Sequence, residues 1–146
     1  MAIHFYHWKK NYGWLSNYSP HGFHLEGRFW PTVEHYYQAH KFSVDSEHFN
    51  IIAEEEKPGR AKNLTRKFVE FVRDDWDEIK DKVMYKAVLV KFSENPAIKE
   101  MLIATGDQKL VEQSPTDLYW GVGVDNTGLN KLGKILQRVR SDLNSN

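Results

Sequence analysis

Apolar and polar residues alternate near the start of the chain, and apolar residues recur at helical spacing over much of the remainder. The alternation predicts short strands, one pair of which forms a hairpin that turns at Glu26-Gly27. The elements predicted from these patterns are a strand at 3–6, the hairpin at 23–30, strands at 109–112 and 118–120, and loops at 11–22 and 121–128.

The helical repeat predicts that helices dominate the fold. The first of them follows the hairpin directly, and Thr32 is placed to cap its start. The predicted helices are 31–42, 45–52, one from Pro58 through Leu64, 76–93, 97–104, and a last one with an apolar stripe at Leu129, Leu132, Leu136, Val139 and Leu143. We therefore expect an α+β fold that is mostly helical, with a small antiparallel sheet.

The composition is that of one folded domain. The 146 residues, 40 % hydrophobic and 14 % aromatic, suffice for one core, so we expect a single domain over 1–146. The formal net charge of zero removes a whole-protein electrostatic argument for nonspecific binding to nucleic acids or membranes. Without cysteine, thiolate catalysis and disulfides are excluded. No signal peptide or membrane span is predicted, so we expect a cytoplasmic protein.

The first predicted helix carries a polar row. Glu34, Gln38 and Lys41 stand at i, i+4 and i+7, which places them on one face. From spacing alone, a solvated row of surface side chains is the favoured interpretation. Aromatic and histidine neighbours are unusual for a face in water, however, and a carboxylate, an amide and an amine in an aromatic cleft would make a reaction site.

A second polar group lies near the C-terminus. Asp117 stands just before two aromatic residues and the loop at 121–128. An acid in a turn is usually a cap or solvated, but opposite Glu34 it would complete a pair able to divide acid and base duties. The loop runs into the last helix, where backbone amides can cradle a phosphate. Considered alone, an ordinary loop is favoured.

Other candidate groups give weaker signals. A loose cluster of basic residues is formed by Lys62, Arg66 and Arg73. A solvated surface is the favoured interpretation of this cluster, and a clamp for phosphate is the alternative. Gly133 in the last helix indicates close packing. The spacing of the seven histidines does not favour chelation, so no metal site is expected.

Taken together, these segments resemble the NADAR, or YbiA-like, family over almost the whole chain. The resemblance rests on Phe5-Tyr6, 15–18, 30–42, Asp75-Trp76, Met84, Lys91-Phe92, 110–112, 117–123 and 128–133.

The resemblance implies a compact α+β fold and an N-glycosidase, a hydrolase that cleaves a bond between a ribose carbon and a base-like nitrogen. It implies two classes of substrate. One is ADP-ribose attached to guanine, in a nucleoside or a nucleic acid, whose removal reverses ADP-ribosylation. The other is the ribosylamino-pyrimidine phosphates of early riboflavin synthesis. We expect no cofactor and no membrane partner, and a modified single strand is an easier nucleic-acid partner than long duplex DNA.

On this basis we assign roles to individual residues. Breaking a C–N glycosidic bond requires stabilised positive charge, a proton for the departing nitrogen and a nucleophile. The candidate catalytic residues are Glu34 and Asp117, for charge stabilisation and proton transfer, and Lys41, as a nucleophile that forms a Schiff base. The candidate substrate-binding residues are Asn17, Trp30, Tyr37, Gln38, Trp120, Gly121, Gly123 and Asn130.

Two other classes remain open. One is a module that binds ADP-ribose or a nucleotide without turnover, and the other is an interaction protein that uses exposed aromatic residues. Between the two substrate classes we favour ADP-ribosyl-guanine slightly, because the glycine loop and the basic residues suit a diphosphate.

Overall fold

The computed structural model describes residues 1–145. The chain divides into two units, one formed by residues 20–91 and the other by residues 1–19 together with the segment from 92 onward. One boundary between them falls inside the longest helix, α4 (Trp76–Glu94). The expectation of a single domain over 1–146 stays a prediction.

The unit 20–91 begins with the predicted hairpin. Strands β2 (Phe23–Leu25) and β3 (Arg28–Trp30) pair antiparallel, with Phe23 opposite Trp30. The turn residues Glu26 and Gly27 have φ values of 57° and 78°, the left-handed conformation that a two-residue hairpin turn requires. Three helices follow: α1 (Val33–Ala39), α2 (Glu47–Glu54) and α3 (Pro58–Lys67).

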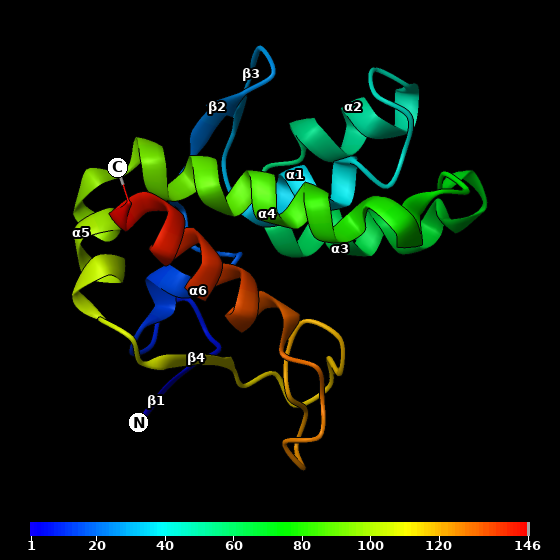
Figure 1. Ribbon diagram of the computed structural model, residues 1–146. Helices are drawn as coiled ribbons and strands as arrows, with labels where there is room; N and C mark the ends of the chain where they lie inside the picture. The colour runs from blue at the N-terminus through cyan, green and yellow to red at the C-terminus, as the bar shows by residue number, and fades with distance from the viewer. Residues whose placement is uncertain (146) are drawn as a thin grey trace. The chain divides into compact units, whose positions relative to one another are not determined.

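The short helix α1 is the centre of this unit. Its first turn is capped as predicted, because the Thr32 side chain accepts a hydrogen bond from the His35 amide. All seven of its residues are buried, and it packs against β3, α2 and α3 (Figure 1). A helix buried on every side is stabilised by tertiary packing more than by its own hydrogen bonds.

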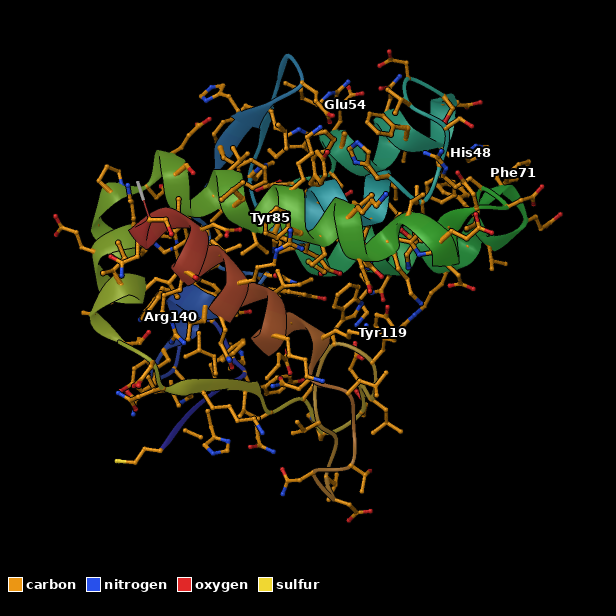
Figure 2. All side chains as sticks on the ribbon, in the orientation of Figure 1. His48, Glu54, Phe71, Tyr85, Tyr119 and Arg140 are labelled. Carbon is orange, nitrogen blue, oxygen red and sulfur yellow. The ribbon has the colours of Figure 1, made fainter. Side chains whose placement is uncertain are left out.

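Aromatic rings fill the space around α1. Trp30, Tyr36, His40 and Phe49 meet in tilted or edge-to-face pairs with ring centroids 3.9 to 5.8 Å apart. A 3₁₀ turn, η2 (Val69–Phe71), follows α3, and its Phe71 stacks on the ring of His48 (Figure 2). This unit is thus held by ring packing on a seven-residue helix.

In the other unit, β1 (Ala2–Phe5) pairs with β4 (Lys109–Glu112). The pairing is parallel, with Ile3 opposite Leu110, and α6 (Lys131–Asn144) packs against β4. Figure 1 shows α6 running beside these strands. The helix α5 (Pro96–Ala104) contacts α6, and a 3₁₀ turn, η1 (Gly13–Leu15), lies in the predicted loop after β1.

The start of α6 lies unusually close to β4. A Cβ atom on Gly133 would collide with the Leu110 carbonyl oxygen and with the Asn130 amide. Asn130 itself joins the two elements, since its Oδ1 accepts from the Glu112 amide and its Nδ2 donates to the Leu110 carbonyl, each at 2.9 Å. The close packing expected at Gly133 is therefore confirmed, and the partner is backbone.

The structure corrects two details of the predicted sheet. Residues 118–120 are not a strand: they form turns held by Asp117, because a short acidic side chain readily bonds to following backbone amides. The antiparallel pair is present as predicted, but the pairing of β1 with β4 is parallel and was not foreseen. Strands more than 100 residues apart carry no local signal of their relative direction.

No helix within residues 1–145 is both long and apolar enough to cross a membrane.

The packing at Gly133 can be tested by substitution. We expect Gly133→Ala to lower the free energy of unfolding by about 1–3 kcal/mol, because the added methyl group must displace backbone. Urea denaturation followed by circular dichroism measures the change. Gly59→Ala is the matched control: nothing lies near its Cβ position in α3, so its stability should stay within about 1 kcal/mol of wild type or rise. A Gly133→Ala protein as stable as wild type would contradict the packing.

Candidate active site

The polar row of α1 is buried. Glu34 is 6 % exposed and Gln38 is 3 % exposed, while Lys41, two residues beyond the helix end, is half-buried. The interpretation of this row as a solvated surface face, which spacing alone favoured, is therefore wrong. Periodicity shows which residues share a face but not which face meets water.

Glu34 and Gln38 are directly joined. The Gln38 Nε2 donates a hydrogen bond of 2.7 Å to the Glu34 Oε2, one helical turn away. The other atom of the amide, the Gln38 Oε1, is buried and accepts no hydrogen bond from any group in residues 1–145. Such atoms are rare in folded proteins and call for an explanation.

The Lys41 amine lies over an aromatic ring, with its Nζ 5.4 Å from the centroid of Tyr37. Burial lowers the pKa of Lys41, because a charged ammonium is poorly solvated there. The Glu34 carboxylate raises the pKa of Lys41, while three nearby cations lower it, and the net direction is downward. A lysine with a lowered pKa is neutral more often at physiological pH and can act as a nucleophile.

The three cations form what we call the cation group: Lys62 and Arg66, one turn apart on α3, and Lys80 on α4. The Lys80 amine also contacts Asp77 at 3.1 Å. The cluster of basic residues predicted from the sequence included Lys62 and Arg66, but its third member was Arg73 and not Lys80. Arg73 is engaged elsewhere, through two hydrogen bonds of its guanidinium to the Asp75 carboxylate. No sequence pattern links Lys80 to α3, so only the structure identifies it.

Two aromatic residues named as base contacts have structural partners. Trp30 is 1 % exposed, and its Nε1 donates to the Leu25 carbonyl oxygen at 3.1 Å. Tyr37 is buried and meets the ring of Trp76 edge to face. Because the Lys41 amine lies over its ring, Tyr37 is nearer to the candidate nucleophile than Trp30 is known to be. Stacking of either ring on a base stays a prediction.

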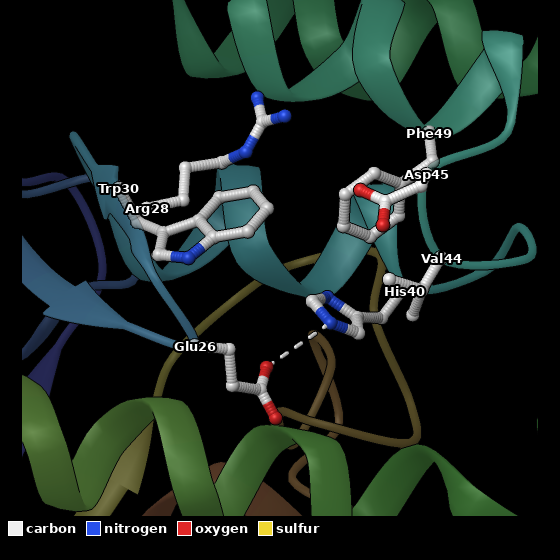
Figure 3. A pocket seen from close by; sticks show the side chains of 7 residues that line it. All are labelled: Glu26, Arg28, Trp30, His40, Val44, Asp45 and Phe49. Atoms are coloured by element: carbon white, nitrogen blue, oxygen red, sulfur yellow. Dashed lines mark ion pairs between the residues drawn. The ribbon is translucent and has the colours of Figure 1, made fainter.

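A pocket of about 290 Å³ opens beside α1, and Figure 3 shows it from close by. The Glu26 carboxylate in this pocket has protein partners: it accepts from the Tyr36 hydroxyl and from Lys86, and lies 3.5 Å from the His40 Nε2. The pocket is lined by Glu26, Arg28, Trp30, His40, Val44, Asp45 and Phe49. None of Glu34, Gln38 and Lys41 lines this pocket, whereas Trp30, a candidate base contact, does.

In the other unit, Asp117 acts as a cap. Its Oδ1 accepts hydrogen bonds from the amides of Tyr119 and Trp120 at 2.9 and 2.8 Å. The ring of Trp120 is buried and packs edge to face on Tyr119, and Asn17 is half-buried after η1. A catalytic role for Asp117, its pairing with Glu34, and substrate contacts from Trp120 and Asn17 stay predictions.

The glycine loop, residues 121–128, packs closely against neighbouring backbone. The amide of Gly128 donates to Val122, and the amides of residues 129–132 donate to carbonyl oxygens of residues 118–121. Cβ atoms on Gly121 or Gly128 would collide with neighbouring backbone. The amides of residues 130–132 at the start of α6 are thus bonded to protein, which leaves these three unavailable to a phosphate. Substrate contacts from Gly121, Gly123 and Asn130 stay predictions.

One buried amine was not singled out from the sequence as a titrating group. Lys91 is 1 % exposed, and burial lowers its pKa to about 7.

Within residues 1–145, no three histidine or acidic side chains lie close enough to hold a metal ion.

A buried carboxylate hydrogen-bonded to an amide, next to an amine of lowered pKa, forms a site suited to acid–base and covalent chemistry. The model of the NADAR domain matches residues 4–144, and the chain belongs to this family, which confirms the resemblance found in the sequence.

Named relatives extend this assignment. An N-glycosidase of Nostoc punctiforme is 46 % identical over 145 residues, which cover 98 % of this chain and 93 % of the relative. The chloroplastic riboflavin biosynthesis protein PYRR of maize is 43 % identical over 97 % of this chain, but the match spans only 25 % of that protein. The NMR structure of the Escherichia coli protein YbiA has a TM-score of 0.91 at 35 % identity and covers 99 % of this chain and 85 % of YbiA. The YbiA-like α+β fold is therefore confirmed.

The electrostatics around Lys41 can be tested by two substitutions with opposite effects. Glu34→Gln removes the carboxylate that favours the ammonium, so the pKa of Lys41 should fall further. Lys62→Met removes a cation that disfavours it, so the pKa should rise. The pH dependence of Lys41 acylation, followed by peptide mass spectrometry, measures both. Shifts of the Lys41 pKa in the same direction in both variants would contradict this arrangement. Lys67→Met, at an exposed position of α3, is the control and should leave the pKa of Lys41 unchanged.

Proposed function

We propose that the chain is an N-glycosidase that hydrolyses the bond between C1 of a phosphorylated ribose and a base-like nitrogen. Its named relatives support this class of activity. The observation that carries the proposal is the polar row of α1, in which Lys41 has a lowered pKa and Glu34 is held by Gln38. A module that only binds nucleotides has no need of a nucleophile beside an acid.

The first half of the reaction transfers the sugar to the enzyme. The reactive form has neutral Lys41 and protonated Glu34. The sugar ring opens when the nitrogen lone pair forms a C1=N double bond, the C1–O4 bond breaks, and O4 takes the proton from Glu34. Neutral Lys41 Nζ then adds to C1. A proton passes from the added Lys41 Nζ to the base-like nitrogen, which departs with the electron pair of its bond to C1. The Nζ lone pair forms a C1=N double bond as that bond breaks, which leaves C1 joined to Lys41 as a protonated Schiff base.

The second half releases the sugar. Glu34, now ionised, accepts a proton from water as the water oxygen adds to C1. The proton of the new C1 hydroxyl passes to Lys41 Nζ, and the bond between C1 and Nζ breaks as a C1=O double bond forms. Its electron pair returns to the amine, and the free sugar leaves. The net reaction consumes one water.

The cation group supports a phosphorylated substrate, because lysine and arginine side chains are the usual partners of phosphate. We propose a ribosylamino-pyrimidine phosphate as the first substrate to test, since the maize relative is named a riboflavin biosynthesis protein. ADP-ribosyl-guanine, favoured from the sequence, is the second, because three cations can also meet a diphosphate.

Parallel assays of both substrates test the proposal. We expect release of the free base or amine together with the phosphorylated sugar, measured by liquid chromatography and mass spectrometry. Lys41→Met and Glu34→Gln should each lower kcat by about 10²–10⁴-fold, because each removes a group that acts on the reacting atoms. Lys67→Met, on the exposed side of α3, should retain wild-type turnover.

Two results would contradict the proposal. Tight binding of either substrate with no product would indicate a binding module. Full turnover in Lys41→Met would exclude the lysine as nucleophile.

A further inference from the structure

The orientation of the Gln38 amide is fixed by its neighbour. Its Nε2 donates to the Glu34 Oε2 at 2.7 Å, and while Glu34 is ionised a rotation of the amide by 180° would place two acceptor oxygen atoms against each other. The Oε1 is therefore held away from Glu34. It is buried and accepts no hydrogen bond within residues 1–145.

A buried carbonyl oxygen without a donor is costly to a fold, and proteins keep such groups where a ligand satisfies them. The requirement on that ligand is specific. Because Oε1 only accepts hydrogen bonds, the ligand must supply an O–H or N–H group, and an ionised phosphate has none.

Position along α1 narrows the choice of donor. Gln38 lies one turn beyond Glu34 on α1, and Lys41 follows two residues past the end of the helix. The Lys41 amine interacts electrostatically with the Glu34 carboxylate, which is also the hydrogen-bond partner of the Gln38 amide. In the proposed reaction the Lys41 amine bonds to C1 of the sugar. The hydroxyl on C2 is then the sugar donor attached nearest to the bond that Lys41 makes.

We propose that the Gln38 Oε1 accepts a hydrogen bond from the 2-hydroxyl of the substrate ribose and so makes the site selective for ribose over 2-deoxyribose. This inference rests on the proposed function and names the feature of the sugar that the site recognises. Contacts to a sugar 2-hydroxyl strengthen as positive charge develops at C1, so Gln38 contributes to rate as well as to affinity. Gln38 is a specificity-determining residue that also positions Glu34.

The test uses ring analogues that cannot react. Calorimetry measures binding of 1,4-anhydroribitol 5-phosphate, of its 2-deoxy counterpart and of its 3-deoxy counterpart to wild type and to Gln38→Met, a substitution of similar length without an acceptor amide. We expect wild type to bind the parent analogue about tenfold more tightly than the 2-deoxy compound, the scale of one buried hydrogen bond. Gln38→Met should bring this ratio close to one.

The ratio separates recognition from a general loss of structure, because a misfolded variant weakens all three analogues together. Gln38→Leu repeats the test if Gln38→Met fails to fold. Three results would each overturn the inference. Wild type binds the parent and 2-deoxy analogues equally well, the variant keeps a tenfold preference for the parent over the 2-deoxy analogue, or the variant loses only its preference for the parent over the 3-deoxy analogue. Selective binding without turnover of either substrate would overturn the proposed activity and leave the role of Gln38 intact.

Discussion

The burial of Glu34 and Gln38 on one short helix, with Lys41 half-buried just past the end of that helix, is the constraint on which this site depends. Glu34 is 6 % exposed and Gln38 is 3 % exposed, and removing a carboxylate and an amide from water is costly. The hydrogen bond between these two side chains offsets part of that cost. The same burial lowers the pKa of Lys41 and leaves the Gln38 Oε1 in need of a donor. One physical cause thus underlies the roles that we propose for Glu34, Lys41 and Gln38.

The rest of the unit 20–91 holds this arrangement in place. Capping by Thr32 starts α1 at a fixed residue, and the amide of Arg73 binds the Lys41 carbonyl oxygen at 2.8 Å just beyond the helix end. Ring packing around Tyr36 covers the other side of the helix. A seven-residue helix is unstable alone, so its rigidity comes from these contacts.

Much of the fold could be predicted from local patterns, and much of the site could not. Turn chemistry at Glu26-Gly27, the cap at Thr32 and the prolines that start α3 and α5 act over a few residues, and the elements lie where these signals place them. The parallel pairing of β1 with β4, the burial of the polar row and the contribution of Lys80 depend on distant segments. The turn at 118–120 was mistaken for a strand because its aromatic residues resemble strand composition, while the capping role of Asp117 was only one of two alternatives.

The central claim is that Lys41 bonds to the sugar during turnover. Wild-type protein is mixed with substrate, treated with borohydride to reduce any Schiff base, and digested for peptide mass spectrometry. We predict one sugar adduct, located on Lys41 and absent from Lys41→Met, with the half-exposed Lys86 as an internal control that stays unmodified. An adduct on another lysine, or turnover with no adduct at all, would contradict the covalent mechanism.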